Sequence, residues 1–262
     1  MKTSTIKKVA SLFAATAIIL SSVYAQSLSG YDVMKKSDQV PSPKTSSYKA
    51  TMTLTNKKGK TRVREVTMKT KDYGDVEKNL IVFTTPKDVA GVSYLTFDYD
   101  ATGKESDSWL YMPAMKKVRR ISGTSKGDDF MGTDFTYDDV GSDRDLDDYT
   151  YKLLGEENAE GFACYKVECR AKDKTVKNPR YIVWIRKDNF IMTKADFYDK
   201  QDMLQRQLVC SGIEKIEGFW TTKKMNMTNV QTGHSTLLEM TNIVFGLDLS
   251  DNLFTQGALE RN

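Results

Sequence analysis

The chain has 262 residues, with 39 lysines and arginines, 35 aspartates and glutamates, and a formal net charge of +4. Its 28% charged and 39% hydrophobic residues exclude both a disordered chain and an integral membrane protein of helical spans. A single histidine and three cysteines exclude His-rich metal sites and a disulfide-stabilised scaffold. At this length the chain can form one large β domain with a substantial core.

The first 25 residues are predicted to be a cleaved export signal. Three lysines within the first eight residues precede an apolar run from Val9 to Leu20, which is too short to span a bilayer. Small residues at Val23 and Ala25 mark the cleavage site, and no cysteine follows it to carry a lipid anchor. We therefore expect residues 26–262 to form one soluble domain in the periplasm. Without the three signal lysines, 36 basic residues face 35 acidic ones (39 less 3), so no nucleic-acid partner is expected.

The remaining chain is predicted to be almost entirely β. A short amphipathic helix is expected within residues 29–40, with Tyr31, Val33 and Met34 facing a core, and two prolines at 41 and 43 end it. Alternating apolar and polar residues separated by turn residues then predict strands. These cover residues 48–54, 61–70, 78–85, 92–99, 108–112, 117–122, 149–155, 164–171, 180–186, 190–198, 203–211, 219–229 and 235–245. One helical turn is expected over 251–259.

The fold class that follows is mainly β. Helical periodicity between the strands is nearly absent, which argues against a parallel βαβ sheet. So many strands in one meander curl, so we predict a strongly curved antiparallel sheet or incomplete barrel with few short helices. Several strands carry large apolar residues at both odd and even positions, which point to opposite faces of the sheet. This indicates that both faces are covered. Helices, a bound apolar ligand or an ordinary two-sided core would each satisfy this pattern.

One stretch, residues 111–140, is more specific than the rest. Its runs YMPAMKKVRRISG and KGDDFMGTDFTYDDV closely resemble the periplasmic outer-membrane lipoprotein-sorting proteins, the LolA-like family. The export signal, the early helix, the successive strands and the late Asn252-Leu253-Phe254 agree with this resemblance.

The resemblance implies an unclosed half-barrel whose concave face is lidded by short helices around an apolar cavity for acyl chains. Such a protein would ferry a lipoprotein or phospholipid between inner-membrane transport machinery and an outer-membrane acceptor. It would act as a monomer with transient membrane contact, without cofactor, metal or catalysis. The related fold also serves as an envelope sensor or scaffold, and this alternative stays open.

Two groups of residues are candidates for contact with cargo or membrane. The large apolar side chains that could line the cavity are Tyr48, Met52, Leu54, Phe83, Leu95, Phe97, Trp109, Tyr111 and Trp184. The alternation of side chains along a strand does not say which face of the sheet is concave. About half of these candidates could therefore lie on the convex face. The basic residues that could meet lipid headgroups or an acidic partner are Lys116, Lys117, Arg119 and Arg120. A charged edge strand protected from aggregation explains the same residues.

Other motifs carry less weight. Residues 123–127 spell G-x-S-x-G, but a nucleophile elbow needs a buried parallel strand before it and a helix after it. Asp98 to Gly103 mimics half of a calcium loop, yet Trp109 stands where the bidentate Glu belongs, so a hairpin turn is preferred. The acidic run between Asp138 and Asp148 is interpreted as a solvated loop rather than a weak cation site.

The three cysteines are also informative. Cys164 and Cys169 are five residues apart on one strand, so they face opposite sides and cannot pair with each other. Either could meet Cys210 across strands, which leaves at least one thiol unpaired within the monomer.

Overall fold

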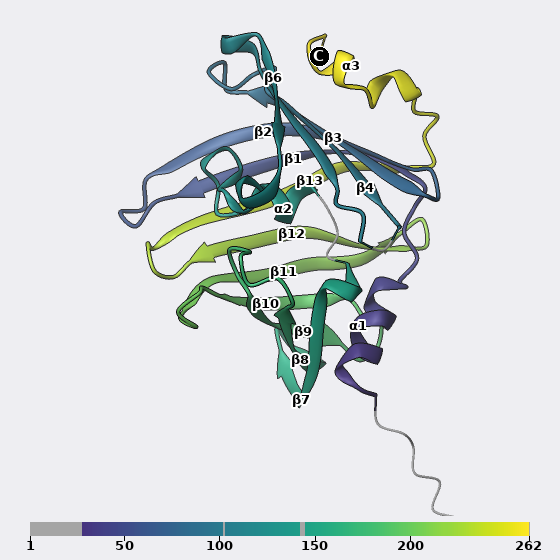
Figure 1. Ribbon diagram of the computed structural model, residues 1–262, viewed down its shortest axis with the longest axis vertical. Coiled ribbons are helices and arrows are strands. Elements are labelled where there is room, and N and C mark those ends of the chain that lie inside the picture. Colours follow the sequence, from purple (N-terminus) through teal and green to yellow (C-terminus); the bar gives the residue numbers. More distant parts are fainter. Residues whose placement is uncertain (1–27, 102, 142–144, 262) are drawn as a thin grey trace, which may run out of the picture.

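The computed structural model of the protein describes residues 28–101, 103–141 and 145–261, and the predicted export signal lies outside them. One antiparallel sheet of 13 strands forms the molecule (Figure 1). The strands are β1 (Thr45–Thr55), β2 (Thr61–Asp72), β3 (Val76–Thr85), β4 (Ser93–Tyr99), β5 (Asp107–Met112), β6 (Lys117–Ile121), β7 (Tyr149–Ala159), β8 (Phe162–Ala171), β9 (Arg180–Arg186), β10 (Met192–Tyr198), β11 (Leu204–Ile216), β12 (Phe219–Asn229) and β13 (His234–Phe245). Each predicted strand is present, and the unclosed antiparallel sheet confirms the predicted fold class.

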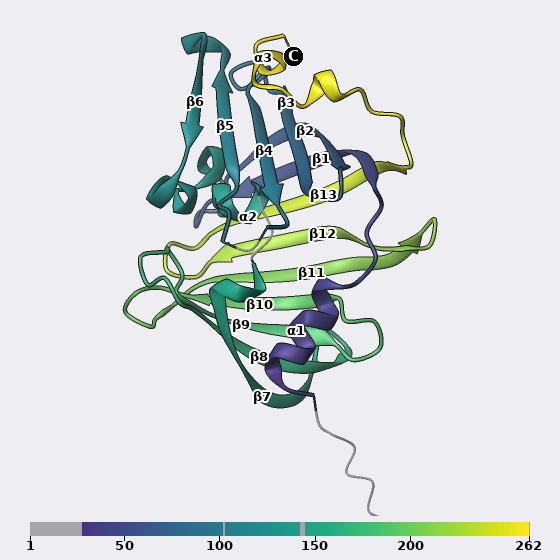
Figure 2. The ribbon, with the colours of Figure 1, turned by 45° about the vertical axis from the view of Figure 1, so that its right-hand side comes forward.

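The order of the strands explains the path of the chain. The sheet runs β6-β5-β4-β3-β2-β1-β13-β12-β11-β10-β9-β8-β7, so β1 and β13 join two meanders at its centre. The strands therefore begin at the centre with β1 and reach one edge at β6, and the chain must cross to the opposite edge to begin β7. The segment between β6 and β7 makes this crossing, and strands β7 to β13 then return one by one to the centre. The curvature of the two halves toward each other is visible in Figure 2.

Short helices lie against this sheet: α1 (Gly30–Asp38), α2 (Tyr137–Gly141) and α3 (Gln256–Leu259), with 3-10 turns η1 (Pro113–Met115), η2 (Gly123–Gly127), η3 (Phe130–Gly132), η4 (Leu146–Asp148) and η5 (Asp251–Leu253). Helix α1 begins with a capping box between Ser29 and Asp32, and it packs on β7, β8 and β9. Its approach to β7 is close, because a Cβ at Gly30 would lie 2.8 Å from the Leu153 nitrogen.

The helix prediction holds for Val33, which is fully buried, and for Met34, which packs on the core. It was wrong for Tyr31, which is 43% exposed. The Tyr31 ring leans over Tyr151 of β7 at 6.1 Å between centroids instead of entering the core.

The two faces of the sheet form separate apolar clusters. The larger cluster joins side chains from both halves of the sheet, such as Phe83 and Leu110 on one side and Val167 and Val183 on the other. Only the face on which the two halves converge can bring these together, and we call it the enclosed face. Neighbouring residues on the same strands, such as Leu80 and Leu95, point to the opposite face because side chains alternate. Within the described residues, no helix is long and apolar enough to cross a membrane.

Candidate functional site

The crossing segment fills the enclosed face with its own side chains. Residues 128–141, which we call the plug, pass between the two halves of the sheet and include η3 and α2. Phe130 is completely buried, and Phe135 and Tyr137 are buried beside it in the large cluster. The space that an apolar ligand would need is therefore occupied by aromatic rings of the same chain.

The Phe130 ring is the centre of this packing. Its centroid lies 5.7 Å from Phe83 of β3 and 5.4 Å from Tyr94 of β4. Tyr137 packs edge-on against it at 5.4 Å. The Tyr94 hydroxyl donates a hydrogen bond to the Tyr137 carbonyl at 3.2 Å, and burial raises the Tyr94 pKa, so this donor keeps its proton. Tilted and edge-on contacts of this kind are favourable beyond the area they bury.

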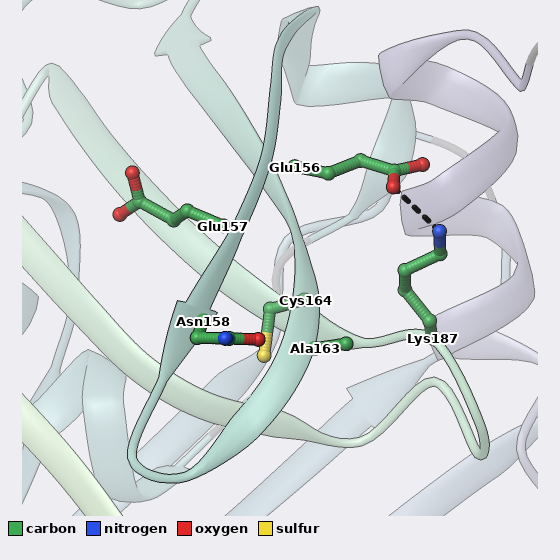
Figure 3. Close-up of a pocket in the computed structure, with 6 residues that line it drawn as sticks. All are labelled: Glu156, Glu157, Asn158, Ala163, Cys164 and Lys187. Carbon is green, nitrogen blue, oxygen red and sulfur yellow. Dashed lines mark hydrogen bonds and ion pairs between the residues drawn. The ribbon is translucent and has the colours of Figure 1, made fainter.

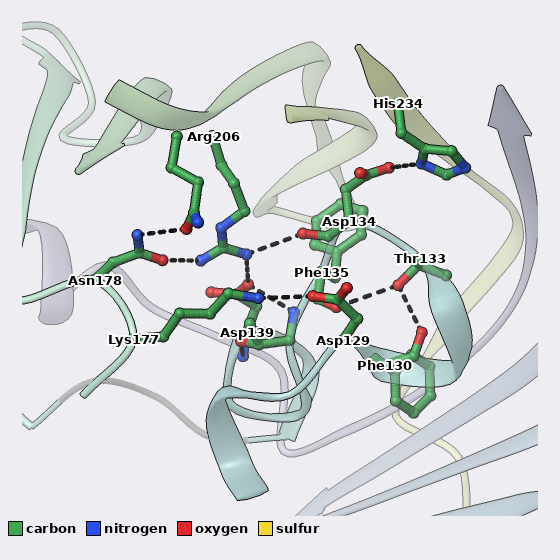
Figure 4. A network of polar contacts seen from close by, with 12 residues as sticks. Asp129, Phe130, Thr133, Asp134, Phe135, Asp139, Lys177, Asn178, Arg206 and His234 are labelled. Atoms are coloured by element: carbon green, nitrogen blue, oxygen red, sulfur yellow. Dashed lines mark hydrogen bonds and ion pairs between the residues drawn. The ribbon is translucent and has the colours of Figure 1, made fainter. Parts of the chain in front are cut away.

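Polar contacts also attach the plug to the second half of the sheet. Arg206 on β11 is buried, and its guanidinium pairs with the Asp139 carboxylate and donates to the Asp134 carbonyl at 3.0 Å (Figure 4). It also donates to Asn178 Oδ1 at 2.7 Å. The Arg206 Nε has no hydrogen-bond partner among the described residues. A buried ion pair with an unsatisfied donor contributes little to stability, but loss of one partner is costly.

A second polar anchor lies on β13. The buried Asp134 carboxylate accepts from Thr236 Oγ1 at 2.7 Å and contacts His234 Nδ1 at 2.6 Å. The Asp134 backbone N–H donates to the same Thr236 hydroxyl at 3.0 Å. At the start of the plug, Lys177 Nζ lies 2.7 Å from Asp129 Oδ1 (Figure 4). On β2, the Arg64 guanidinium donates to the Met131 carbonyl. The plug is thus fastened by charges and hydrogen bonds to both halves of the sheet.

These anchors correct one expectation. The sequence suggested that the acidic run from Asp138 to Asp148 is a solvated loop, but the Asp139 side chain is 6% exposed and paired with Arg206. Asp139 also accepts the Thr136 backbone N–H at 2.8 Å, so it braces the start of α2 as well as binding β11.

The predicted cavity residues divide between the two faces. Tyr48, Met52, Leu54 and Phe83 belong to the enclosed face and pack in the large cluster. Burial raises the pKa of Tyr48 to about 12, so its hydroxyl stays neutral. The residues on the outer face of β4 and β5 are Leu95, Phe97, Trp109 and Tyr111. Trp184 lies in a third cluster with Cys164. The alternation of side chains in the sequence could not show which candidates lie on which face. Contact of any of them with a ligand stays a prediction.

The outer face of β3 to β5 is covered by the end of the chain. We call residues 247–259 the strap. Its Phe254 and Leu259 are completely buried against Leu80, Leu95 and Trp109. These apolar contacts explain why large apolar residues point to both faces of β4 and β5. Both faces of these strands are covered by the protein itself.

The predicted basic group remains at the sheet edge. Lys116 follows η1 in a left-handed conformation with φ of 49°, and Lys117, Arg119 and Arg120 lie on the edge strand β6. All four are exposed, and Arg120 pairs with Asp107 of β5. The tip residue Met115 between the two strands is 56% exposed.

Two pockets of the described chain are lined mainly by polar residues. One of about 280 Å³ lies at the β7–β8 hairpin, where Lys187 Nζ binds Glu156 Oε2 at 2.5 Å (Figure 3). Another, of about 470 Å³, lies between η2 and the β10–β11 turn, and its lining includes Asp129, Lys177 and Asp199. Within the described chain, no group of His, Cys, Asp and Glu is arranged to hold a metal ion.

The G-x-S-x-G run does not have the surroundings of a nucleophile elbow. It forms the 3-10 turn η2 after β6, which is an antiparallel edge strand rather than a buried parallel one. His234, which an esterase would need, is bound to Asp134 of the plug. The calcium-like run begins in β4, which includes Asp98 and Tyr99 and pairs antiparallel with β5, as expected for a hairpin.

The three cysteines are buried thiols and form no disulfide. Cys169 and Cys210 lie on the enclosed face, whereas Cys164 lies in the third cluster, so the predicted opposite orientation of Cys164 and Cys169 is confirmed. Burial raises the pKa of Cys210 to about 12, which makes it unreactive as a thiol while the enclosed face stays covered.

Comparison with known proteins places the chain in a family. A crystal structure of a DUF1329 family protein from Desulfovibrio piger is 38% identical, with a TM-score of 0.83 over 88% of this chain and 97% of that one. A family model described as an uncharacterized protein matches residues 75–261. The chain belongs to the DUF1329 family. No match is found among curated proteins.

Two further solved structures resemble this DUF1329 protein. A putative outer-membrane lipoprotein-sorting protein domain from Vibrio parahaemolyticus is 29% identical, with a TM-score of 0.82 over 88% of this chain and 98% of that one. A LolA superfamily protein from Nitrosomonas europaea is 19% identical, with a TM-score of 0.69 over 88% and 99% of the two chains. The latter shows a shared fold, which confirms the expected LolA-like architecture of this DUF1329 protein.

Proposed function

We propose that this protein is an acyl-chain carrier of the bacterial periplasm. It holds the acyl chains of a lipoprotein or lipid against the enclosed face and transfers them between inner and outer membranes. The observation that carries the proposal is the plug: an apolar face shared by both halves of the sheet, filled by three aromatic rings and fastened by polar contacts. The lipoprotein-sorting name of the Vibrio structure supports the same class of cargo.

The energetics favour exchange of the plug for an acyl chain. Each buried methylene contributes about 0.8 kcal/mol, so a chain of ~14 methylenes gains on the order of 10 kcal/mol on leaving water. When the plug opens, its aromatic rings leave the enclosed face and lose a comparable free energy of burial. At the same time, the polar groups that anchor the plug form hydrogen bonds with water again. Near balance of these terms is what a carrier needs, because it must both bind and release.

Two measurements on the purified full chain test this proposal. Solvent extraction followed by mass spectrometry should find acyl lipid bound near one per protein. In a second assay, the protein should speed the transfer of a fluorescent lipid from donor to acceptor vesicles in proportion to its concentration. Extracts from several expression hosts that contain no acyl species would refute acyl binding.

A protein that binds acyl chains without speeding transfer would contradict carriage and favour the scaffold alternative. In that case the plug would be a fixed part of the core. The two assays therefore separate binding from transport.

A further inference from the structure

A basic hairpin stands at one end of the molecule, far from α1 and β7. Strands β5 and β6 are joined by η1, and this turn lies at one end of the long axis beside the C-terminus (Figure 2). Residues 112–120 read MPAMKKVRR, with four cations and no acidic residue. Met115 at the tip is 56% exposed, and the four basic side chains around it are exposed as well.

Most of this charge is not neutralised by the protein. Arg120 pairs with Asp107 on the neighbouring strand. Lys116, Lys117 and Arg119 have no ion pair among the described residues. The chain as a whole carries only +4, so this concentration of charge is local. A local cationic surface with an apolar tip is the composition expected where a protein contacts an anionic lipid surface.

The directions of the cations identify the kind of partner. Lys117 and Arg119 pair in register with Met112 and Leu110, whose side chains face the enclosed side, while Arg120 pairs with Trp109 on the outer side. Lys116 lies at the turn itself. Charges that surround a tip in several directions match the diffuse negative charge of a bilayer better than one extended acidic peptide. In addition, β6 has only five residues, which is short for addition of a further strand.

We propose that the β5–β6 hairpin docks this protein on anionic phospholipid bilayers. The lysines and arginines lie among the phosphate headgroups, and Met115 enters the interface between headgroups and acyl chains. This goes beyond acyl-chain binding, which concerns the enclosed face. The hairpin would bring the carrier to the surface where cargo is exchanged.

The test is cosedimentation of the full chain with vesicles of phosphatidylcholine containing about one-third phosphatidylglycerol. We expect binding to these vesicles, none to pure phosphatidylcholine, and loss of binding at high salt, because exposed charges are screened over about 10 Å or less. Neutralising three cations in K116Q/K117Q/R119Q should weaken binding about 100-fold, since each contributes roughly a fivefold factor. Met115→Ser should weaken it a few-fold, with little change in salt dependence.

The β1–β2 turn provides a matched control. Its Lys57, Lys58 and Lys60 are also exposed, so K57Q/K58Q/K60Q makes the same change in net charge elsewhere. Equal weakening by both triple variants would overturn the proposal in favour of general electrostatic attraction. Failure of the unmodified protein to bind the anionic vesicles would overturn it too. Thermal unfolding of each variant checks the fold, and lipid extraction tests acyl binding separately.

Discussion

The plug and the strap both cover an apolar face of strands β3 to β5, yet different forces hold them. The strap inserts Phe254 and Leu259 completely into the outer cluster. The plug also buries aromatic rings, but a buried ion pair and the hydrogen bonds of Asp134 fasten it to the far half of the sheet. Apolar insertion is worth several kcal/mol and cannot be replaced by water. Polar anchors contribute less, because water replaces them when the segment opens.

This difference separates a structural cover from a removable one. A segment that must leave its site reversibly gains from contacts whose groups water satisfies in the open state. A segment that must stay gains from contacts that water cannot satisfy. We therefore expect the strap to unfold only with the whole domain and the plug to open locally.

The largest effect is expected from the strap. Phe254→Ala removes a completely buried ring and leaves a cavity against Leu95 and Trp109, which should cost about 4 kcal/mol of unfolding free energy. Urea denaturation measures this loss. Because the change is on the outer face, the affinity of the folded protein for a fluorescent sixteen-carbon fatty acid should stay unchanged. A loss below 1 kcal/mol would show that the strap is loosely attached.

The second effect concerns the plug. Asp139→Asn leaves the Arg206 charge buried without its partner, and breaking such a pair costs about 3 kcal/mol or more. The plug should then open more often, which raises the apparent affinity for the fatty acid. A thiol reagent should modify Cys169 and Cys210 faster, while Cys164 in the third cluster serves as an internal control.

Controls for this variant are available in the chain. Glu214→Gln removes a carboxylate from an exposed pair with Lys223 and should change neither fatty-acid affinity nor labelling. The double change Asp139→Leu with Arg206→Met removes both charges together, so it should open the plug less than Asp139→Asn, which leaves the Arg206 charge unpaired. Faster labelling of all three cysteines would indicate global unfolding and contradict local opening.

The next prediction concerns a substitution in the plug that leaves every charged side chain in place. A Cβ at Gly141 would lie 2.6 Å from the Tyr94 hydroxyl and 2.9 Å from Thr96 Cγ2. Gly141→Ala should therefore push the end of α2 from β4 at a cost of about 1–3 kcal/mol. We expect fatty-acid affinity and the rate of Cys210 labelling to rise, as for Asp139→Asn, but by a smaller factor. An unchanged affinity with lower stability would mean that this contact belongs to the fixed core.

The sequence predicted the sheet well because its information is local. Alternation and turn residues mark each strand, and they placed all thirteen, including the short edge strand β6. The crossing segment could not be predicted in this way. Phe130, Phe135 and Tyr137 lie among glycines and aspartates, a composition typical of an exposed loop. Their burial depends on β6 and β7 being opposite edges, which only the assembled topology reveals.

The polar anchors were missed for the same reason. Asp134 and His234 are 100 residues apart, and Arg206 and Asp139 are 67 apart. No local pattern connects such pairs. One available signal was the group of aromatic residues within an otherwise polar segment, since aromatic side chains are rarely left exposed in numbers.

The smallest effect is expected from an exposed polar contact of the strap. Asp251 accepts from Lys71 Nζ at 2.7 Å and from the Tyr73 hydroxyl at 2.6 Å, and these bonds hold its pKa below the usual value. A carboxyl whose pKa is lowered by folding stabilises the protein above its unfolded pKa of about 4, and the contribution disappears as pH falls through the folded value. Asp251→Asn should therefore lower the urea midpoint slightly at pH 7 and not at all at strongly acidic pH.

Asp248→Asn, three residues away at an exposed site, controls for loss of a negative charge in the strap. It should leave the midpoint unchanged at both pH values. If Asp251→Asn instead lowers the midpoint equally at neutral and acidic pH, the contact acts through packing rather than charge. If it raises fatty-acid affinity, the strap is a removable cover like the plug, and the distinction between the two faces fails.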